Sequence, residues 1–206
     1  MATPSLPLGH RIGSADAQLK IEGWYDFSCP FSAKGFLTIT KEVMPKYERE
    51  HPGKVQFLHY QYPQPWHAPG AYAAEVSLAV EAVDPSKYLA TCQRFFEKQA
   101  DLVFDCVTYD KTRNDLYELL ASAASEETGI DKSAVLEKVK YLGTSPNAGN
   151  EMGQMVKWYV KLGRKNGIHV TPTIYMNGIE EGKISSGWTL EQWSEYLDEK
   201  LGIMKS

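Results

Sequence analysis

The sequence predicts an α/β domain whose chain is interrupted by a separate all-α insertion. Near the start, a strand, a helix and a second strand follow one another, and strand and helix patterns return near the end. Between them, from residue 69 to residue 167, apolar residues recur almost throughout with helical spacing. We therefore expect one domain made of residues 1–64 and 166–206, with residues 65–165 forming the inserted helical domain.

Length and composition agree with this fold class and exclude several functions. A chain of 206 residues can bury a sizeable core without disulfides or metals. Lys and Arg total 22 against 26 for Asp and Glu, and a formal net charge of -4 argues against nucleic-acid binding. No apolar run approaches 18 residues and no secretory leader is visible, so we expect no membrane segment and a cytoplasmic location.

The first unit is a predicted strand–helix–strand. An apolar run over residues 18–27 predicts a strand, a helix follows over 30–47, and residues 55–60 form the second strand. Pro30 suits the first helical turn, where its missing N–H has no partner to lose. Pro45 is expected to kink or end the helix.

The middle and the end of the chain are divided by Gly- and Pro-containing breaks. After the last inserted helix we expect a strand over 170–176, a hairpin turn at Asn177-Gly178, and a returning strand over 183–186. Thr189 and Gln192 form a capping box for a final helix. The predicted helices of the insertion cover residues 71–83, 86–99, 111–125, 131–142 and 150–165, and the final helix covers 189–201.

Cys29 stands where the first strand passes into the first helix. The three cysteines are too few for a disulfide scaffold, and their odd number leaves one thiol unpaired. Free N–H groups and partial positive charge at a helix N-terminus favour a thiolate. The Ser32 hydroxyl, three residues later, is placed to donate a hydrogen bond to the sulfur, and Phe31 to form a binding lip. Cys29 is therefore a candidate nucleophile.

A second candidate segment is Val-Thr-Pro-Thr at residues 170–173. Proline inside a strand removes a hydrogen-bond donor from the ladder. A cis bond between Thr171 and Pro172 would explain its presence, because the resulting bend exposes backbone groups to a ligand.

Together the two segments resemble a known family. Tyr-Asp-Phe-Ser-Cys-Pro-Phe-Ser at residues 25–32, followed much later by Val-Thr-Pro-Thr, is similar to the thioredoxin-like fold in its DsbA-like form. Residues 13–17 and 65–74 also resemble this family. The resemblance implies a thioredoxin-like fold with an inserted all-α helical domain over essentially the whole chain. It also implies the roles of six residues: Cys29 and Ser32 in catalysis, and Pro30, Phe31, Thr171 and Pro172 in substrate binding.

Two departures from the family pattern bear on the reaction. DsbA-like enzymes usually carry Cys-x-x-Cys, and Ser32 stands in place of the second cysteine. The family often has an acidic residue six positions before the first cysteine, and here that position is Gly23. Glu22 or Asp26 could replace the acid only with different geometry. A single thiol still forms mixed disulfides, which an outside thiol such as glutathione can resolve.

We therefore expect a thiol-disulfide oxidoreductase with one active-site cysteine, acting on protein thiols or disulfides or on glutathione as co-substrate. No tightly bound cofactor and no metal are expected. One alternative is a glutathione transferase, since Cys-Pro-Phe-Ser resembles the Ser-Pro-Tyr-Ser of the kappa class. The other is a non-catalytic protein that binds extended peptides in the same groove, as a chaperone or adaptor.

The remaining residues of chemical interest have simpler interpretations. Cys92 and Cys106 are expected to be buried, inert thiols, with pairing or a redox role as the alternative. His67 is expected to be a loop or cap residue, with a general-base role as the alternative. No spacing of His and Cys matches a zinc site, and no phosphate-binding loop or dinucleotide fingerprint is present.

Overall fold

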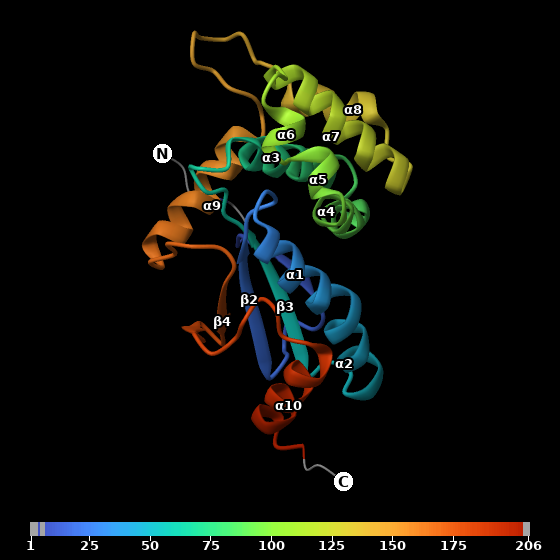
Figure 1. Cartoon of the computed structure of the whole chain (residues 1–206), viewed down its shortest axis with the longest axis vertical. Coiled ribbons are helices and arrows are strands. Elements are labelled where there is room, and N and C mark those ends of the chain that lie inside the picture. The colour runs from blue at the N-terminus through green and yellow to red at the C-terminus, as the bar shows by residue number, and fades with distance from the viewer. Residues whose placement is uncertain (1–3, 5–6, 204–206) are drawn as a thin grey trace.

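A mixed five-stranded sheet forms the centre of the molecule (Figure 1). The computed structural model describes residue 4 and residues 7–203. In the order β1-β3-β2-β4-β5, only β2 and β3 are parallel, as expected for two strands joined through a helix. The strands are β1 (His10–Ile12), β2 (Leu19–Tyr25), β3 (Val55–Gln61), β4 (Thr173–Met176) and β5 (Ile179–Glu180). The sequence did not indicate β1.

The helix after β2 runs further than predicted. It consists of α1 (Pro30–Thr38), a π-helical turn η1 (Ile39–Val43) and α2 (Met44–Glu50), which follow without a break. Pro45 was expected to kink or end the helix. It does not end the helix, because α2 continues to Glu50. Pro45 lies in the first turn of α2, directly after the π-helical turn, where its missing N–H leaves the preceding hydrogen bonds intact.

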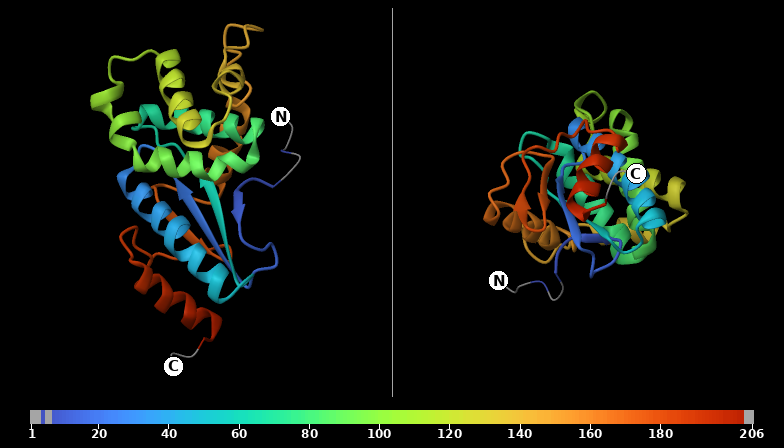
Figure 2. Two further views of the ribbon diagram at one scale, coloured as in Figure 1. Left: turned by 90° about the vertical axis from the view of Figure 1, so that its right-hand side faces the viewer. Right: turned by 90° about the horizontal axis from the view of Figure 1, so that it is seen from below.

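A layer of helices covers the carboxyl ends of β2 and β3 (Figures 1 and 2). The insertion is helical as predicted, although its helices begin and end at other residues. The predicted helix 86–99 divides into a 3-10 turn and α4, and the predicted helix 131–142 ends at Val139. The helices of the layer are α3 (Ala68–Val83), η2 (Pro85–Lys87), α4 (Tyr88–Glu97), α5 (Gln99–Leu102), α6 (Asp105–Thr108), α7 (Arg113–Thr128) and α8 (Lys132–Val139).

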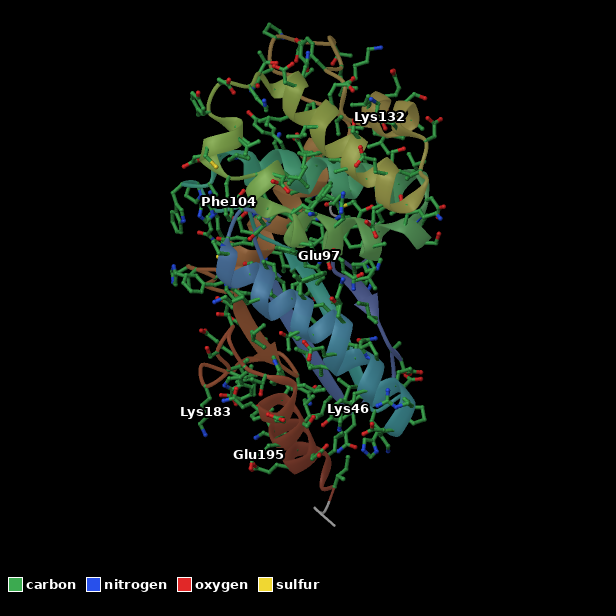
Figure 3. All side chains as sticks on the ribbon, turned by 45° about the vertical axis from the view of Figure 1, so that its right-hand side comes forward. Lys46, Glu97, Phe104, Lys132, Lys183 and Glu195 are labelled. Atoms are coloured by element: carbon green, nitrogen blue, oxygen red, sulfur yellow. The ribbon has the colours of Figure 1, made fainter. Side chains whose placement is uncertain are left out.

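An ion pair joins the layer to the helix beside it. Glu97 of α4, labelled in Figure 3, contacts Lys41 of η1. Both side chains are partly exposed, so water screens the pair and its contribution to stability is small. The buried contacts of α4 with α1, which include Phe96 against Phe36, are the stronger connection.

Each face of the sheet has its own apolar cluster. On one face, Ile21 and Phe57 pack with α1, α4 and the C-terminal helix α10 (Leu190–Leu201). On the other face, Trp24 and Tyr60 pack with Tyr159 of α9 (Gly153–Lys165). The helix α9 thus contacts both the sheet and α3 of the helical layer, and the predicted domain boundary at residue 165 stays a prediction.

The C-terminal hairpin is shorter than predicted. Asn177 and Gly178 have φ values of 51° and 81°, the left-handed pair that a two-residue turn requires. Such a turn places the returning strand at Ile179–Glu180, so the predicted strand over 183–186 is wrong. The final helix and its capping box, Thr189 with Gln192, are confirmed. No helix in the described part of the chain is long and apolar enough to span a membrane.

Candidate active site

Cys29 lies at the first turn of α1, where the sequence predicts it. It is the N-cap residue, with φ −86° and ψ 118°, and Pro30 follows in the first turn. The side chain is 5% exposed. Its thiol donates a hydrogen bond of 3.2 Å to the backbone carbonyl of Thr171, 142 residues further along the chain. The fold therefore brings together the two segments that the sequence analysis selected.

The segment opposite Cys29 is bent immediately before β4. The peptide bond between Thr171 and Pro172 is cis, the geometry predicted from the sequence. Thr173 begins β4 and its hydroxyl donates to the Val170 carbonyl at 2.7 Å. Phe31 is 60% exposed and Val170 59%, so each segment carries an apolar side chain open to solvent.

Ser32 is fully buried and takes part in the backbone structure of the loop before α1. Its hydroxyl oxygen accepts a hydrogen bond of 3.2 Å from the Asp26 N–H. Among the described residues, no hydrogen bond joins Ser32 to the sulfur of Cys29. The predicted donation to the sulfur therefore stays a prediction.

A side chain of the helical layer hydrogen-bonds to the loop that contains Cys29. Gln99 of α5 donates its amide N–H groups to two carbonyls of the loop, at 2.6 Å to Phe27 and at 3.0 Å to Cys29. Gln99 is itself buried. Buried polar groups that are satisfied in this way fix a backbone conformation strongly. The insertion thus positions the first turn of α1.

The site contains a pair formed by Asp26 and His67, which the sequence analysis named separately, as a possible replacement acid and as an alternative general base, but did not bring together. Asp26 is buried, and its Oδ2 lies 2.6 Å from Nδ1 of His67. The same carboxyl accepts backbone N–H groups of Ser28 and Gln64, each at 3.0 Å. Burial raises the pKa of Asp26, whereas the hydrogen bonds from Ser28, Gln64 and His67 oppose that rise.

His67 was expected to be a loop or cap residue. It is the N-cap residue of α3, but its side chain makes no cap hydrogen bond and its ring faces Asp26 instead. Gly70 in the next turn leaves room for the carboxyl, because a Cβ there would lie 2.3 Å from Asp26 Oδ1. The sequence Trp-His-Ala-Pro-Gly at residues 66–70 is the signal that could have drawn attention to His67. Only the fold reveals that the partner of His67 is Asp26.

Neither Gly23 nor Glu22 provides the acid that the family often carries. A Cβ on Gly23 would lie 2.1 Å from the ring of Tyr25, which packs over that position. Burial raises the pKa of the Tyr25 phenol, which stays protonated. Glu22 accepts the Gly178 N–H at the C-terminal hairpin. Asp26 is therefore the carboxyl nearest to Cys29 along this strand–helix junction.

The other two thiols differ from each other. Cys92 is fully buried as predicted, and burial raises the pKa of its thiol well above the usual range. Cys106 was expected to be buried and is exposed, because α6 is a single short turn at the edge of the layer. All three cysteines are free thiols. In the described part of the chain, no three His, Cys, Asp or Glu side chains are grouped as metal ligands require.

This fold and this thiol site define a thioredoxin-like protein of the DsbA-like form. The chain belongs to the thioredoxin family, whose family model matches residues 5–199.

Solved structures support the architecture. BdbD from Bacillus subtilis matches with 24% identity and a TM-score of 0.68, over 93% of this chain and 92% of its own. A proposed protein-disulfide isomerase from Pseudomonas syringae has 22% identity and a TM-score of 0.69, covering 91% and 96%. The thiol-disulfide exchange protein alpha-DsbA2 from Wolbachia pipientis has 19% identity and a TM-score of 0.64, covering 92% and 85%. No curated protein sequence matches. At these identities the likeness establishes the fold.

Proposed function

We propose that this protein is a thiol-disulfide oxidoreductase that uses Cys29 alone. The observation that carries the proposal is the position of its sulfur, at the N-terminus of α1 and 3.2 Å from the Thr171 carbonyl. A substrate chain lying along residues 170–172 would therefore pass next to the sulfur. The solved structures with the same fold include one described as a thiol-disulfide exchange protein.

The exchange proceeds in two balanced steps. The thiolate of Cys29 attacks one sulfur of a substrate disulfide, forming a mixed disulfide and releasing the other sulfur as a thiolate. A second thiolate, from glutathione or a protein, then attacks the substrate sulfur of the mixed disulfide, forming a new disulfide with the substrate and releasing Cys29 as a thiolate. Ser32 has no sulfur and cannot act as that second thiol, and Cys92 is fully buried in the core. The remaining sources of the resolving thiol are the exposed Cys106 and a thiol from outside the chain, and we propose the outside thiol.

The test is adduct formation with oxidised glutathione, followed by mass spectrometry. Because Cys106 is exposed and would react by itself, the experiment uses the Cys106→Ser protein as its parent. We expect one glutathione adduct, on Cys29, which reduced glutathione removes. Cys29→Ser in the same parent should abolish it, and Cys92→Ala should leave it unchanged. If Cys29 forms no adduct across pH 6 to 9, the proposal is wrong.

A second candidate function is binding of extended peptides without catalysis. The exposed side chains of Phe31 and Val170 support it, since they flank the Cys29 sulfur and suit an apolar partner. Peptide binding by Cys29→Ser protein with no adduct on the parent would favour this function. The transferase alternative needs Ser32 or a backbone amide at the start of α1 to stabilise the glutathione thiolate, and the complete burial of Ser32 weighs against the first of these. The cytoplasmic location stays a prediction.

A further inference from the structure

A small pocket lies between the start of α3 and the helix α9, next to the loop that follows β3. Its volume is about 330 Å³, within the range of small-ligand sites. Tyr62 and Ala71 contribute to its apolar wall, together with Val160 of α9. Three polar side chains complete it: Gln64, His67 and Arg164.

The polar side chains of this pocket offer nitrogen donors and no carboxylate. Arg164 is exposed and has no ion-pair or hydrogen-bond partner among the described side chains. The amide nitrogen of Gln64 is buried and also lacks a partner in the described part of the chain. His67 is 25% exposed, and its Nδ1 faces Asp26, which leaves Nε2 as the ring nitrogen on the side away from that carboxyl. This set of groups suits an anion, and a planar carboxylate matches the guanidinium fork.

Two contacts connect the pocket to the thiol site. His67 contacts Asp26, which precedes Cys29 by three residues. The Tyr62 hydroxyl donates at 3.0 Å to the carbonyl of Ile168, which precedes Thr171 by three residues. Three residues of chain extend about 10 Å at most. Two residues that line the pocket therefore contact positions that lie within three residues of the two segments of the thiol site.

We propose that this pocket binds a carboxylate of a small acidic thiol peptide, the class to which glutathione belongs, with Arg164 as the main anion-binding residue. The inference rests on the proposed function, because it names the substrate class of the same site. The apolar wall would contact the methylene groups of such a peptide, and the small volume suits it better than a folded protein.

The experiment measures binding without thiol chemistry. S-methylglutathione, which cannot form a disulfide, is titrated into the Cys29→Ser protein by calorimetry or NMR. Arg164→Gln should weaken its binding about tenfold, the effect of losing one charge-assisted contact. Lys165→Gln removes the same charge from the neighbouring position, outside the pocket, and should change binding less than about twofold. Equal losses in both variants would show general charge attraction and overturn the proposal.

A second ligand identifies the group that Arg164 binds. The same peptide with its glycine carboxylate converted to an amide should bind about tenfold more weakly to the Cys29→Ser protein, and Arg164→Gln should then cause little further loss. An undiminished effect of Arg164→Gln on the amide would overturn the carboxylate assignment. If binding follows these expectations and Cys29 forms no adduct, the carboxylate site at Arg164 is supported and the proposed exchange reaction of Cys29 is refuted.

Discussion

Two regions of this molecule each contain a cysteine, a histidine and a side chain with an ionisable oxygen, which is Asp26 in one region and Tyr88 in the other. The two regions differ in how the cysteine can react. At the rim of the sheet, Cys29 lies in the loop that Asp26 and His67 support. In the interior, His59 lies 3.2 Å from the hydroxyl of Tyr88, and Tyr88 neighbours Cys92. Cys29 is 5% exposed and Cys92 is fully buried, so low exposure is common to both thiols.

The surroundings of the two regions differ far more than their exposure. Burial raises the pKa of Cys92 and Tyr88 and lowers the pKa of His59 to about 3, so all three groups are neutral. At the rim, the helix N-terminus provides partial positive charge next to Cys29, and the partly exposed His67 contacts Asp26. The comparison shows that charge and access, rather than buried area, separate a candidate nucleophile from a structural thiol.

The largest expected effect is a difference in alkylation rate between the two thiols. With iodoacetamide at pH 7.5, Cys92 should react at least about a thousandfold more slowly than Cys29, because reagent reaches it only when the core opens. Peptide mapping of the Cys106→Ser protein over time gives both rates. In denaturant the two rates should become similar. Comparable rates in the folded protein would remove the distinction between the regions.

The second effect is a loss of stability in acid that comes from the interior. The folded-state pKa of His59 is lowered to about 3 by burial, with a smaller contribution from the charge of His10. A depressed pKa means that the neutral ring stabilises the fold above about pH 6.5, and that this stability falls as pH falls towards 3. Between pH 7 and pH 4 the loss is about 3 kcal/mol.

Replacement of His59 isolates this contribution. The unfolding free energy of His59→Phe, measured with urea, should depend less on pH than that of the parent by about 3 kcal/mol over this interval. His169→Gln, at an exposed position, should follow the parent at every pH. Parallel pH profiles for His59→Phe and the parent would mean that His59 is hydrated in the folded protein.

Local sequence patterns predict the thiol site well because its parts are local. The strand that ends at Tyr25, the N-cap cysteine and the proline before β4 each depend on a few neighbouring residues. The hairpin turn and the capping box of α10 succeed for the same reason. That Cys29 meets Thr171 followed from the family resemblance, since no local rule connects residues so far apart.

The failures concern residues whose environment is set by packing. His67 faces Asp26 because the loop before α3 crosses the end of β2, which the pattern of neither segment reveals. Pro69 lies in the first turn of α3, where proline is tolerated, so the helix begins at Ala68 and not at the predicted residue 71. The returning strand was misplaced because the two-residue turn fixes its position directly.

A smaller effect tests how closely the carboxyl group of Asp26 is packed against α3. Gly70→Ala adds a Cβ 2.3 Å from Asp26 Oδ1, and this overlap should destabilise the fold by about 2 kcal/mol. Gly35→Ala, also in a helix, adds a Cβ with no contact below 3.7 Å and should be neutral or slightly stabilising. Urea unfolding measures both. Equal stabilities would show that the loop carrying Asp26 moves aside at little cost.

The smallest expected effect decides whether burial or hydrogen bonding dominates at Asp26. Burial, the larger influence, raises the pKa of Asp26, so the folded protein holds the proton more tightly than the unfolded chain does. Stability from this group is then complete below its ordinary pKa and falls as pH rises through the raised value. Asp26→Asn cannot ionise, so it should gain stability relative to the parent as pH rises from 4 to 7, measured by urea unfolding. If Asp26→Asn instead loses stability relative to the parent as pH rises, the hydrogen bonds from His67 and from the backbone N–H groups of Ser28 and Gln64 outweigh burial. Asp26 would then be a fixed anion beside Cys29, and the two regions would differ in net charge as well as in access.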